Sequence, residues 1–389
     1  MNDERQSAQR TLHGRAFVDG TVRERVSVAI EAGRIAAVRS GVEAPAGAER
    51  IDGLLVPGFV DLHVHGGAGA DFMDGTVEAA RRVCAFHARH GTVALAATTL
   101  TAPRREIAAA VAAATALARA PGPGEARVAG IHLEGPYLNP AKAGAQDPAS
   151  LRAADGEELE EWLGAAAGLP VTMTIAPEVP GVLELIEAFA GRLTFSVGHT
   201  EASDELTFRA LAAGARRFTH LWNAMPPLHH RRPGTVGVAL ASPDATLELI
   251  ADGLHVHPLL LAACAHMAPA RVALVTDAMR AAGMPDGRYS LARLEVEVRR
   301  ENGQRSVRLA SGALAGSLLT MDAAVRTMVR EAGLSLEHAL PLASTVPARA
   351  LGLDGKGRIA AGADADLVEL DDDLAAARVW IGGEELSRA

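Results

Sequence analysis

Aromatic side chains are scarce in this 389-residue chain, where they make up only 3% of the residues. Any core must therefore be built mainly from Ala, Val and Leu. Apolar residues still reach 49% and charged residues 22%, a composition typical of globular rather than disordered proteins. The length suffices for one large barrel, or for a large domain with a small one.

Cysteine and positive charge are also limited. The two cysteines, Cys84 and Cys264, have no CxxC neighbour, so we expect small buried residues in a reducing compartment. A formal charge of −9 argues against a nucleic-acid surface. Residues 1–10 are polar and lack a signal-peptide core, and no uninterrupted run of 18 apolar residues occurs. We expect a cytoplasmic protein without a membrane span.

Short extended segments with turns occupy both ends of the chain. Near the N-terminus they are 15–18, 26–30 and 34–38, with Asp19-Gly20 as a hairpin signal, and near the C-terminus they are 357–359, 366–370 and 377–381. We expect both ends, 1–57 plus 346–389, to form one small β-sandwich domain. The alternative is two separate terminal appendages.

The middle of the chain, 58–345, alternates short apolar runs with Ala-rich amphipathic segments. The eight runs are 58–65, 93–100, 128–134, 171–176, 193–199, 217–223, 247–252 and 272–277; helical candidates include 76–90, 104–119, 182–190, 203–213 and 257–266. This alternation predicts a TIM-type (β/α)8 barrel inserted into the small domain, although seven or nine strands are not excluded. After the eighth run we expect a hairpin of 290–299 and 305–310, then helices at 320–332 and 336–340.

Metal-ligand residue types stand at the carboxyl ends of the predicted barrel strands, where barrel active sites lie. His63 and His65 are two residues apart, so both imidazoles project to one side of the first strand. The later strand ends supply Glu134, His199, His220 and Asp277, and the seventh strand leads to His255. So many polar groups at a barrel mouth would cost stability unless they bound something. Imidazole with carboxylate predicts Zn²⁺, Fe²⁺, Mn²⁺ or Co²⁺ rather than Ca²⁺.

The remaining histidines have simpler explanations. His132 lies on the same side of its strand as Glu134, so it either supports the ligands or fills the barrel interior. Asp61 either orients a ligand histidine or has a structural role. The histidines in loops are expected at the surface: His229, His230 and His257. Those in helical segments are expected to have structural roles: His87, His90, His266 and His338.

Several blocks of sequence resemble one family in order and spacing from about residue 53 to the C-terminus. The blocks are PGFVDLHVH at 57–65, HLEGPYLN at 132–139, GHT at 198–200, THLWNAM at 219–225, ADGLH at 251–255, VTDA at 275–278 and LAGSLLTM at 314–321. They are similar to the N-acetylglucosamine-6-phosphate deacetylases of the amidohydrolase superfamily. HLEGP and THLWNAM separate that family from other amidohydrolases.

The resemblance implies a role for each matched residue. Glu134, His199 and His220 would hold the catalytic metal, most commonly Zn²⁺, and His63 with His65 a second ion. The substrate-binding residues would be Ala145, Asn223, Ala224, Arg231, His255, Leu314, Ala315 and Gly316. The resemblance further implies a homodimer in which a neighbouring subunit helps to complete the phosphate site.

The implied reaction is removal of the acetyl group from N-acetylglucosamine-6-phosphate. Hydroxide from metal-activated water attacks the amide, and Asp277 acts as general base and then as general acid. Many members of the superfamily use a carboxylated lysine, but the only lysines, Lys142 and Lys356, lie in a loop and in the tail. Glu134 would supply the carboxylate instead.

One position departs from the family pattern. Gln146 occupies the place, in GAQDP at 144–148, where the family usually has a histidine that polarises the amide carbonyl. Its amide can donate a hydrogen bond but carries no charge. Another N-acetylated amino-sugar phosphate is therefore an alternative substrate. A separate alternative is another amidohydrolase that acts on an N-acyl amino acid or a cyclic amide. A barrel retained only as a scaffold is disfavoured, because every ligand position and Asp277 are present.

Overall fold

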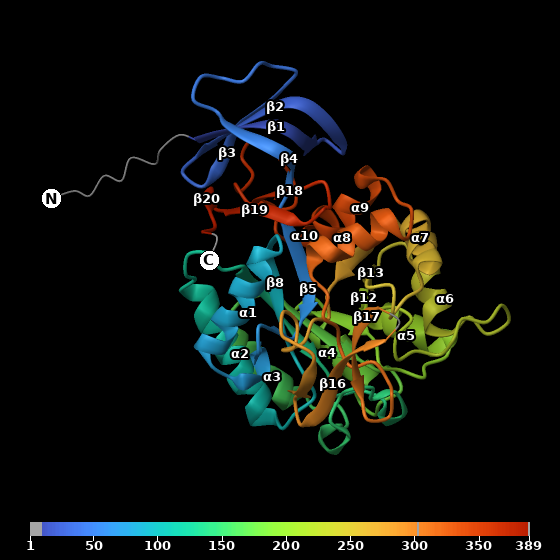
Figure 1. The fold of residues 1–389 in the computed structure, drawn as a ribbon. Coiled ribbons are helices and arrows are strands. Elements are labelled where there is room, and N and C mark those ends of the chain that lie inside the picture. The colour runs from blue at the N-terminus through green and yellow to red at the C-terminus, as the bar shows by residue number, and fades with distance from the viewer. Residues whose placement is uncertain (1–9, 302, 388–389) are drawn as a thin grey trace.

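A barrel lies beneath a smaller sheet in the computed structural model, which describes residues 10–301 and 303–387 (Figure 1). The smaller sheet has seven strands in the order β20-β19-β18-β4-β1-β2-β3. Its strands are β1 Arg10–Val18, β2 Thr21–Glu31, β3 Arg34–Ser40, β4 Glu49–Pro57, β18 Leu367–Leu370, β19 Ala376–Ile381 and β20 Glu384–Glu385. Because β18 pairs with β4, strands from both termini share this sheet, as predicted.

The small sheet folds over its own core. A segment at 363–365 joins its two ends, because Ile35 N–H donates to Ala363 O at 2.8 Å and Gly383 N–H donates to Ala365 O at 2.8 Å. Leu12, Val28 and Trp380 are fully buried between the halves. Asp19 and Gly20, both at positive φ, form the expected two-residue turn between β1 and β2. The strand expected at 357–359 was wrong, since these residues lie in a loop. The exact domain boundaries stay a prediction.

The barrel contains eight parallel strands, one for each predicted run. They are β5 Phe59–Val64, β8 Thr92–Thr99, β9 Arg127–Glu134, β10 Val171–Ile175, β11 Thr194–Val197, β12 Arg217–Phe218, β13 Thr246–Ile250 and β14 Val272–Val275. The sheet order is β14-β13-β12-β11-β10-β9-β8-β5. Two short strands, β6 Gly66–Gly67 and β7 Ala70–Asp71, follow β5.

Helices cover the outside of the barrel (Figure 1). Their bounds are α1 Val77–Arg89, α2 Arg104–Arg119, α3 Gly156–Ala166, α4 Val182–Phe189, α5 Asp204–Ala213, α6 Gly234–Ala241, α7 Pro258–Met267, α8 Met321–Arg330, α9 Leu336–Ala343 and α10 Thr345–Ala350; the 3₁₀ turns are η1 Phe72–Asp74, η2 Pro140–Lys142 and η3 Pro148–Ser150. Cys84 in α1 and Cys264 in α7 are buried and free. Across the described ranges, no helix combines the length and apolar character needed to cross a bilayer.

The barrel closes through the buried carboxylate of Asp61 on β5. This carboxylate accepts hydrogen bonds from the hydroxyl of Thr276 at 2.5 Å, from the Thr276 backbone N–H at 3.2 Å and from the His63 backbone N–H at 3.1 Å. Asp277 N–H also donates to His63 O at 2.8 Å. Asp61 therefore joins the first strand to the segment that follows the eighth, and its contact with His63 is to the backbone rather than to the imidazole.

A three-stranded sheet follows the eighth strand, where a two-stranded hairpin was expected. It consists of β15 Gly287–Leu291, β16 Leu294–Glu301 and β17 Gln304–Leu309, paired antiparallel. The expected turn between the last two strands includes Asn302, which lies outside the described residues. A buried cluster that contains Leu291, Val296 and Met279 packs this sheet onto the mouth of the barrel.

We expect His87 to make the protein less stable in mild acid. Burial lowers the pKa of this histidine to about 4, although its ring Nε2 lies 2.9 Å from Gly66 O. Stability from the neutral ring is fully present above the unfolded pKa of ~6.5 and declines as pH falls toward the folded value, by up to about 3 kcal/mol. The His87→Gln variant should therefore show a smaller fall in melting temperature than the wild type between about pH 8 and about pH 5.

The matched control for this prediction is His266→Gln, which changes an exposed histidine on α7. Ion binding also makes stability depend on pH, but this effect is the same in the wild type and in both variants. An equal pH dependence in His87→Gln and in the wild type would contradict the prediction.

Candidate metal centre and active site

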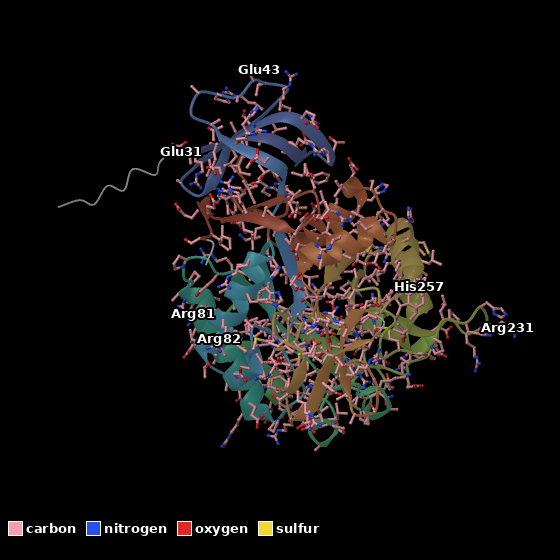
Figure 2. All side chains as sticks on the ribbon, viewed as in Figure 1. Glu31, Glu43, Arg81, Arg82, Arg231 and His257 are labelled. Carbon is pink, nitrogen blue, oxygen red and sulfur yellow. The ribbon has the colours of Figure 1, made fainter. Side chains whose placement is uncertain are left out.

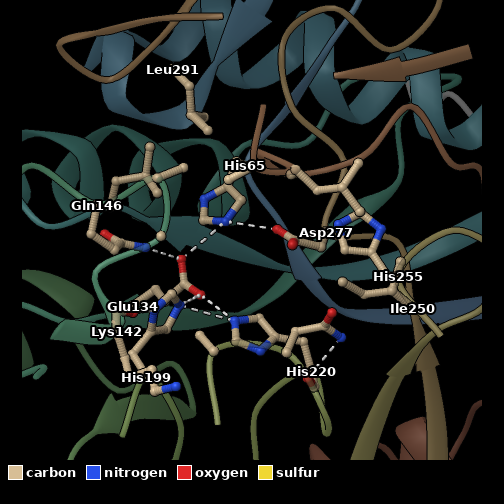
Figure 3. A pocket seen from close by; sticks show the side chains of 18 of the residues that line it. His65, Glu134, Lys142, Gln146, His199, His220, Ile250, His255, Asp277 and Leu291 are labelled. Atoms are coloured by element: carbon tan, nitrogen blue, oxygen red, sulfur yellow. Dashed lines mark hydrogen bonds and ion pairs between the residues drawn. The ribbon is translucent and has the colours of Figure 1, made fainter. Parts of the chain in front are cut away.

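The carboxyl ends of five barrel strands bring six predicted residues to one mouth. Figure 3 labels all of them except His63. His63 lies on β5 and His65 directly after it, and Glu134 is the last residue of β9. The other three residues each follow a strand by two positions: His199 after β11, His220 after β12 and Asp277 after β14. The six are at most 8% exposed.

The Glu134 carboxylate lies between two pairs of imidazoles. Its Oε1 is 3.2 Å from His199 Nε2 and 3.1 Å from His220 Nε2. Its Oε2 is 3.3 Å from His65 Nε2, and Oε1 is 3.5 Å from His63 Nε2. A single carboxylate thus belongs to two three-residue groups, one with each histidine pair.

The spacing of the donor atoms suits a metal ion in each group. His199 Nε2 and His220 Nε2 are 3.0 Å apart, and His63 Nε2 and His65 Nε2 are 3.1 Å apart. Four ligands held tetrahedrally around Zn²⁺ at ~2.0–2.1 Å lie roughly 3.3 Å from one another. Two nitrogens and one carboxylate oxygen in each group also form a donor set that zinc-like metals prefer.

The local electrostatics favour positive charge at this position. Burial would lower the pKa of His65, but Asp277 and Glu134 outweigh burial and raise it to about 9. Burial would raise the pKa of Glu134, but His63, His199 and His220 hold it well below its usual range. The negative field that stabilises a protonated imidazole would also stabilise a divalent cation, which would displace the proton.

Three of these residues adopt a left-handed backbone conformation. His199, His220 and Asp277 have φ values of 48°, 29° and 48°. Non-glycine residues rarely adopt such values, and each costs of the order of 1 kcal/mol or more. The sharp turn at each strand end directs the side chain into the mouth, so the strain is consistent with a functional constraint.

Asp277 lies on the side of the site next to the second histidine pair. Its Oδ1 is 3.2 Å from His65 Nε2 and 3.5 Å from His63 Nε2. Burial would raise the pKa of Asp277, but the two histidines hold it below its usual value. The carboxylate also lines the cavity, so it can reach both a metal ion and a bound molecule.

Gln146 makes close contact with a predicted metal ligand. Its Nε2 donates to Glu134 Oε2 at 2.5 Å, and its Oε1 accepts from the Thr101 N–H at 2.7 Å. These two bonds fix the orientation of the amide. Because an amide nitrogen carries two hydrogens, the second N–H can serve a ligand in the cavity that Gln146 lines.

A cavity of about 360 Å³ opens above the metal ligands, a volume within the usual range for small-molecule sites. Six of the eight predicted substrate-binding residues line it: Ala145, Asn223, Ala224, His255, Leu314 and Gly316. Ala315 is buried between two lining residues. The sequence prediction missed Lys142, Ile250 and Leu291, which also line the cavity.

The missed residues carried weak sequence signals. Lys142 belongs to a 3₁₀ turn in the loop after β9, where its backbone oxygen lies 2.7 Å from His199 Nδ1. Leu291 comes from the inserted sheet, whose place over the mouth depends on tertiary packing. Only the position of Ile250, at the end of β13, could have been predicted from the strand pattern.

Two positively charged groups differ in their distance from the cavity. His255 lies at its wall, and although burial lowers the pKa of this histidine, Asp252 raises it above the usual value through a 2.6 Å contact with Nδ1. Arg231 is exposed at the tip of a loop that projects from the barrel and does not line the cavity of its own chain (Figure 2).

His132 does not reach the cavity. It is fully buried inside the barrel, with Nε2 2.7 Å from the Thr174 hydroxyl and Nδ1 3.3 Å from Leu62 O. Its ring lies edge-on to that of His63, with 4.5 Å between centroids. Of the two interpretations left open by the sequence, the interior position is the one observed.

Comparison with known proteins relates this geometry to characterised enzymes. Residues 54–386 match the model of the amidohydrolase family. The chain is 42% identical over 338 residues to an N-acetylgalactosamine-6-phosphate deacetylase of Escherichia coli O157:H7, covering 86% of this chain and 88% of that protein. It is 37% identical over 384 residues to an N-acetylglucosamine-6-phosphate deacetylase of Vibrio furnissii, covering 97% and 93%.

A solved structure agrees with these similarities. The N-acetyl-D-glucosamine-6-phosphate deacetylase of Mycobacterium smegmatis, in the form of a variant in complex with N-acetyl-D-glucosamine-6-phosphate, superposes with a TM-score of 0.92. The two sequences are 36% identical, and the match covers 98% of this chain and 100% of the other. The chain therefore belongs to the amidohydrolase family of enzymes and, within it, to the group that contains the N-acetylglucosamine-6-phosphate deacetylases.

Proposed function

We propose that this protein removes the acetyl group from N-acetylglucosamine-6-phosphate, giving glucosamine-6-phosphate and acetate. The observation that carries this proposal is the arrangement of two imidazole pairs and Asp277 around Glu134 at the floor of the cavity. Glu134, His199 and His220 would hold the catalytic ion, and His63 with His65 a second one. A bound divalent ion would lower the pKa of water toward ~7 and polarise the amide carbonyl.

Asp277 is the general base and then the general acid in this proposal. Its carboxylate lines the cavity beside the proposed ligands and can accept a proton from the attacking water. It can then return that proton to the amine nitrogen, which must be protonated because an amide anion is a poor leaving group. The free N–H of Gln146 would support the negative charge that develops on the carbonyl oxygen.

We propose that the phosphate site is completed by a second subunit. His255, at the cavity wall, provides one positive charge, while Arg231 projects away from its own cavity. In the described parts of the chain, all large hydrophobic side chains that are strongly exposed lie on α5, on the projecting loop or on α7: Phe208, Leu228, Leu259, Leu260 and Met267. These exposed apolar side chains and the projecting arginine suit a homodimer in which each subunit places this loop at the cavity of the other.

The metal and the compartment are further parts of the proposal. Zn²⁺ is the preferred ion because nitrogen and carboxylate ligands at these spacings suit it, with Fe²⁺, Mn²⁺ and Co²⁺ as the competing ions. The cytoplasm is the preferred compartment because Cys84 and Cys264 are both free.

A second candidate substrate is N-acetylgalactosamine-6-phosphate, which differs in configuration at C4 of the sugar. The 42% identical relative from Escherichia coli O157:H7 is named for that substrate. Both sugars carry the same acetamide and phosphate, so the metal centre and the charged groups would serve either.

Acetate release from a panel of N-acetyl hexosamine 6-phosphates tests the proposed reaction. We expect N-acetylglucosamine-6-phosphate to have the highest kcat/KM, and removal of metal with a chelator to abolish turnover until a divalent ion is restored. Metal analysis of the same sample identifies the ion. Preference for the galactosamine compound would select the second candidate, and release from N-acyl amino acids alone would contradict both.

The Asp277→Asn variant tests the proton-transfer role. We expect it to retain its metal, since Glu134, His199 and His220 are unchanged, while kcat falls by ~10²–10⁴-fold. Metal content and steady-state kinetics on one preparation provide the measurement. A kcat close to that of the wild type would remove Asp277 from this role.

Arg231→Ala tests phosphate recognition across subunits. Losing one charged hydrogen bond should raise KM for the phosphorylated sugar by ~10–100-fold, with little effect on unphosphorylated N-acetylglucosamine. Mixed dimers of Arg231→Ala and Asp277→Asn subunits should regain low-KM activity, because one site combines an intact Asp277 with the partner's arginine. If mixing restores nothing, Arg231 does not act across the interface.

A further inference from the structure

A buried ion pair lies inside the barrel beneath the proposed metal ligands. Glu248 on β13 is 0% exposed and Arg217 on β12 is 1% exposed, and their side chains approach to 3.7 Å. The reaction proposed above uses neither residue. Removing two charges from water is expensive, and a buried pair is often no more stable than apolar residues of similar size. Stability is therefore a weak explanation for this pair.

Glu248 contacts one member of the second histidine pair directly. Its Oε2 lies 3.2 Å from His63 Nδ1, while His63 Nε2 faces Glu134 and His65 on the other side of the ring. An ionised carboxylate can only accept hydrogen bonds, so His63 Nδ1 must carry the hydrogen. The lone pair of the neutral ring then lies on Nε2, directed at the position of the second ion.

Arg217 faces the other carboxylate oxygen of Glu248 at ion-pair distance, and its own position is fixed by two hydrogen bonds. One guanidinium nitrogen donates to the Thr172 hydroxyl at 3.0 Å, and another donates to Ala350 O at 3.0 Å, at the start of the connection to the C-terminal strands. Glu248 Oε2 also accepts from the His220 backbone N–H at 3.4 Å. The carboxylate is thus held between the strands that carry the two metal groups.

The two histidine pairs are oriented in different ways. In the first pair, His199 Nδ1 has the neutral carbonyl of Lys142 as its partner. In the second pair, His63 Nδ1 has the Glu248 carboxylate as its partner. The other imidazole of each pair, His220 or His65, has no Nδ1 hydrogen-bond partner among the described residues. The difference between the pairs is the chemistry of that one partner: a neutral carbonyl behind His199 and a carboxylate behind His63, which accepts the stronger hydrogen bond.

His132 offers no competing explanation for Glu248. Its ring nitrogens lie near those of His63 and the carboxylate of Glu248, a grouping that could in principle hold an ion. Both nitrogens of His132 are, however, already within hydrogen-bond distance of the Leu62 carbonyl and the Thr174 hydroxyl. That leaves orientation of His63 as the role that fits the contacts.

We propose that Glu248, paired with Arg217, is a positioning residue that fixes the His63 tautomer and thereby determines the affinity of the second metal site. This inference rests on the metal-dependent function proposed above. Loss of a hydrogen-bond partner behind a metal-bound histidine typically weakens metal binding by ~10–100-fold.

The test is metal binding by Glu248→Gln, measured without turnover. Protein stripped of metal is titrated with Zn²⁺, and bound ions are counted after dialysis at each free concentration. We expect the wild type to bind two ions, and the variant to bind the first ion normally and the second ~10–100-fold more weakly. Glu369→Gln is the matched control, because Glu369 is a buried glutamate in the small sheet, hydrogen-bonded to the Asp52 and Gly53 N–H groups.

A double variant separates orientation of His63 from simple neutralisation of Arg217. Glu248→Gln with Arg217→Met leaves no unpaired charge, so it also serves if the single variant does not fold. The second site should stay weak in the double variant. Recovery of wild-type affinity would overturn the inference, since Glu248 would then only balance Arg217.

Two other outcomes would also overturn it. One is unchanged affinity for the second ion in Glu248→Gln. The other is a wild-type protein that binds a single ion even with excess Zn²⁺; if that protein still released acetate from the sugar phosphate, the proposed function would stand without the second site. A protein that binds two ions with the expected affinities but deacetylates no sugar phosphate would contradict the proposed function and leave the role of Glu248 standing.

Discussion

The Glu134 carboxylate is the interaction on which the rest of the site depends. It is 2% exposed and within 3.5 Å of the Nε2 atoms of four histidines, with Gln146 donating to its second oxygen. A negative charge so deeply buried is tolerated only where positive charge surrounds it. The same charge makes the imidazoles favour protons or a metal. Histidines from three other barrel strands, β5, β11 and β12, therefore meet at one carboxylate on β9.

The barrel has to hold its first and last strands together for this arrangement to exist. His63 comes from β5 and Asp277 from the segment after β14, and Asp61 joins the two through Thr276. The small sheet contributes at the other end of β5, since β4 runs directly into it and Gly58 N–H donates to Asp366 O at 2.9 Å. The pairing of the termini thus fixes the start of the strand whose far end carries the histidine pair.

Much of this arrangement could be predicted from sequence, for a physical reason. Parallel barrel strands bring their carboxyl ends to one rim, so strand ends alone indicated that Glu134, His199 and Asp277 would meet. The same rule says nothing about a residue inside the barrel, so Glu248 was counted as part of an apolar run. A charged residue within an otherwise apolar run was the sequence feature that could have indicated its role. Nor could the same rule place Arg231, because a loop between elements has no periodicity that fixes its direction, and its tip lies outside the chain's own cavity.

The cavity joins two regions of opposite charge preference. At its floor, Glu134 and Asp277 create a field that favours cations, and at its wall His255, paired with Asp252, favours an anion. A molecule with a neutral acetamide at one end and a phosphate at the other can place the phosphate at His255 while its acetamide reaches the floor. In the reverse orientation the acetamide would leave the His255 imidazole without an anionic partner and would no longer reach Asp277 at the floor. Orientation in this site is therefore favoured by the separation of the anion-binding wall from the residues at the floor, since complementary charge provides specificity more than raw affinity.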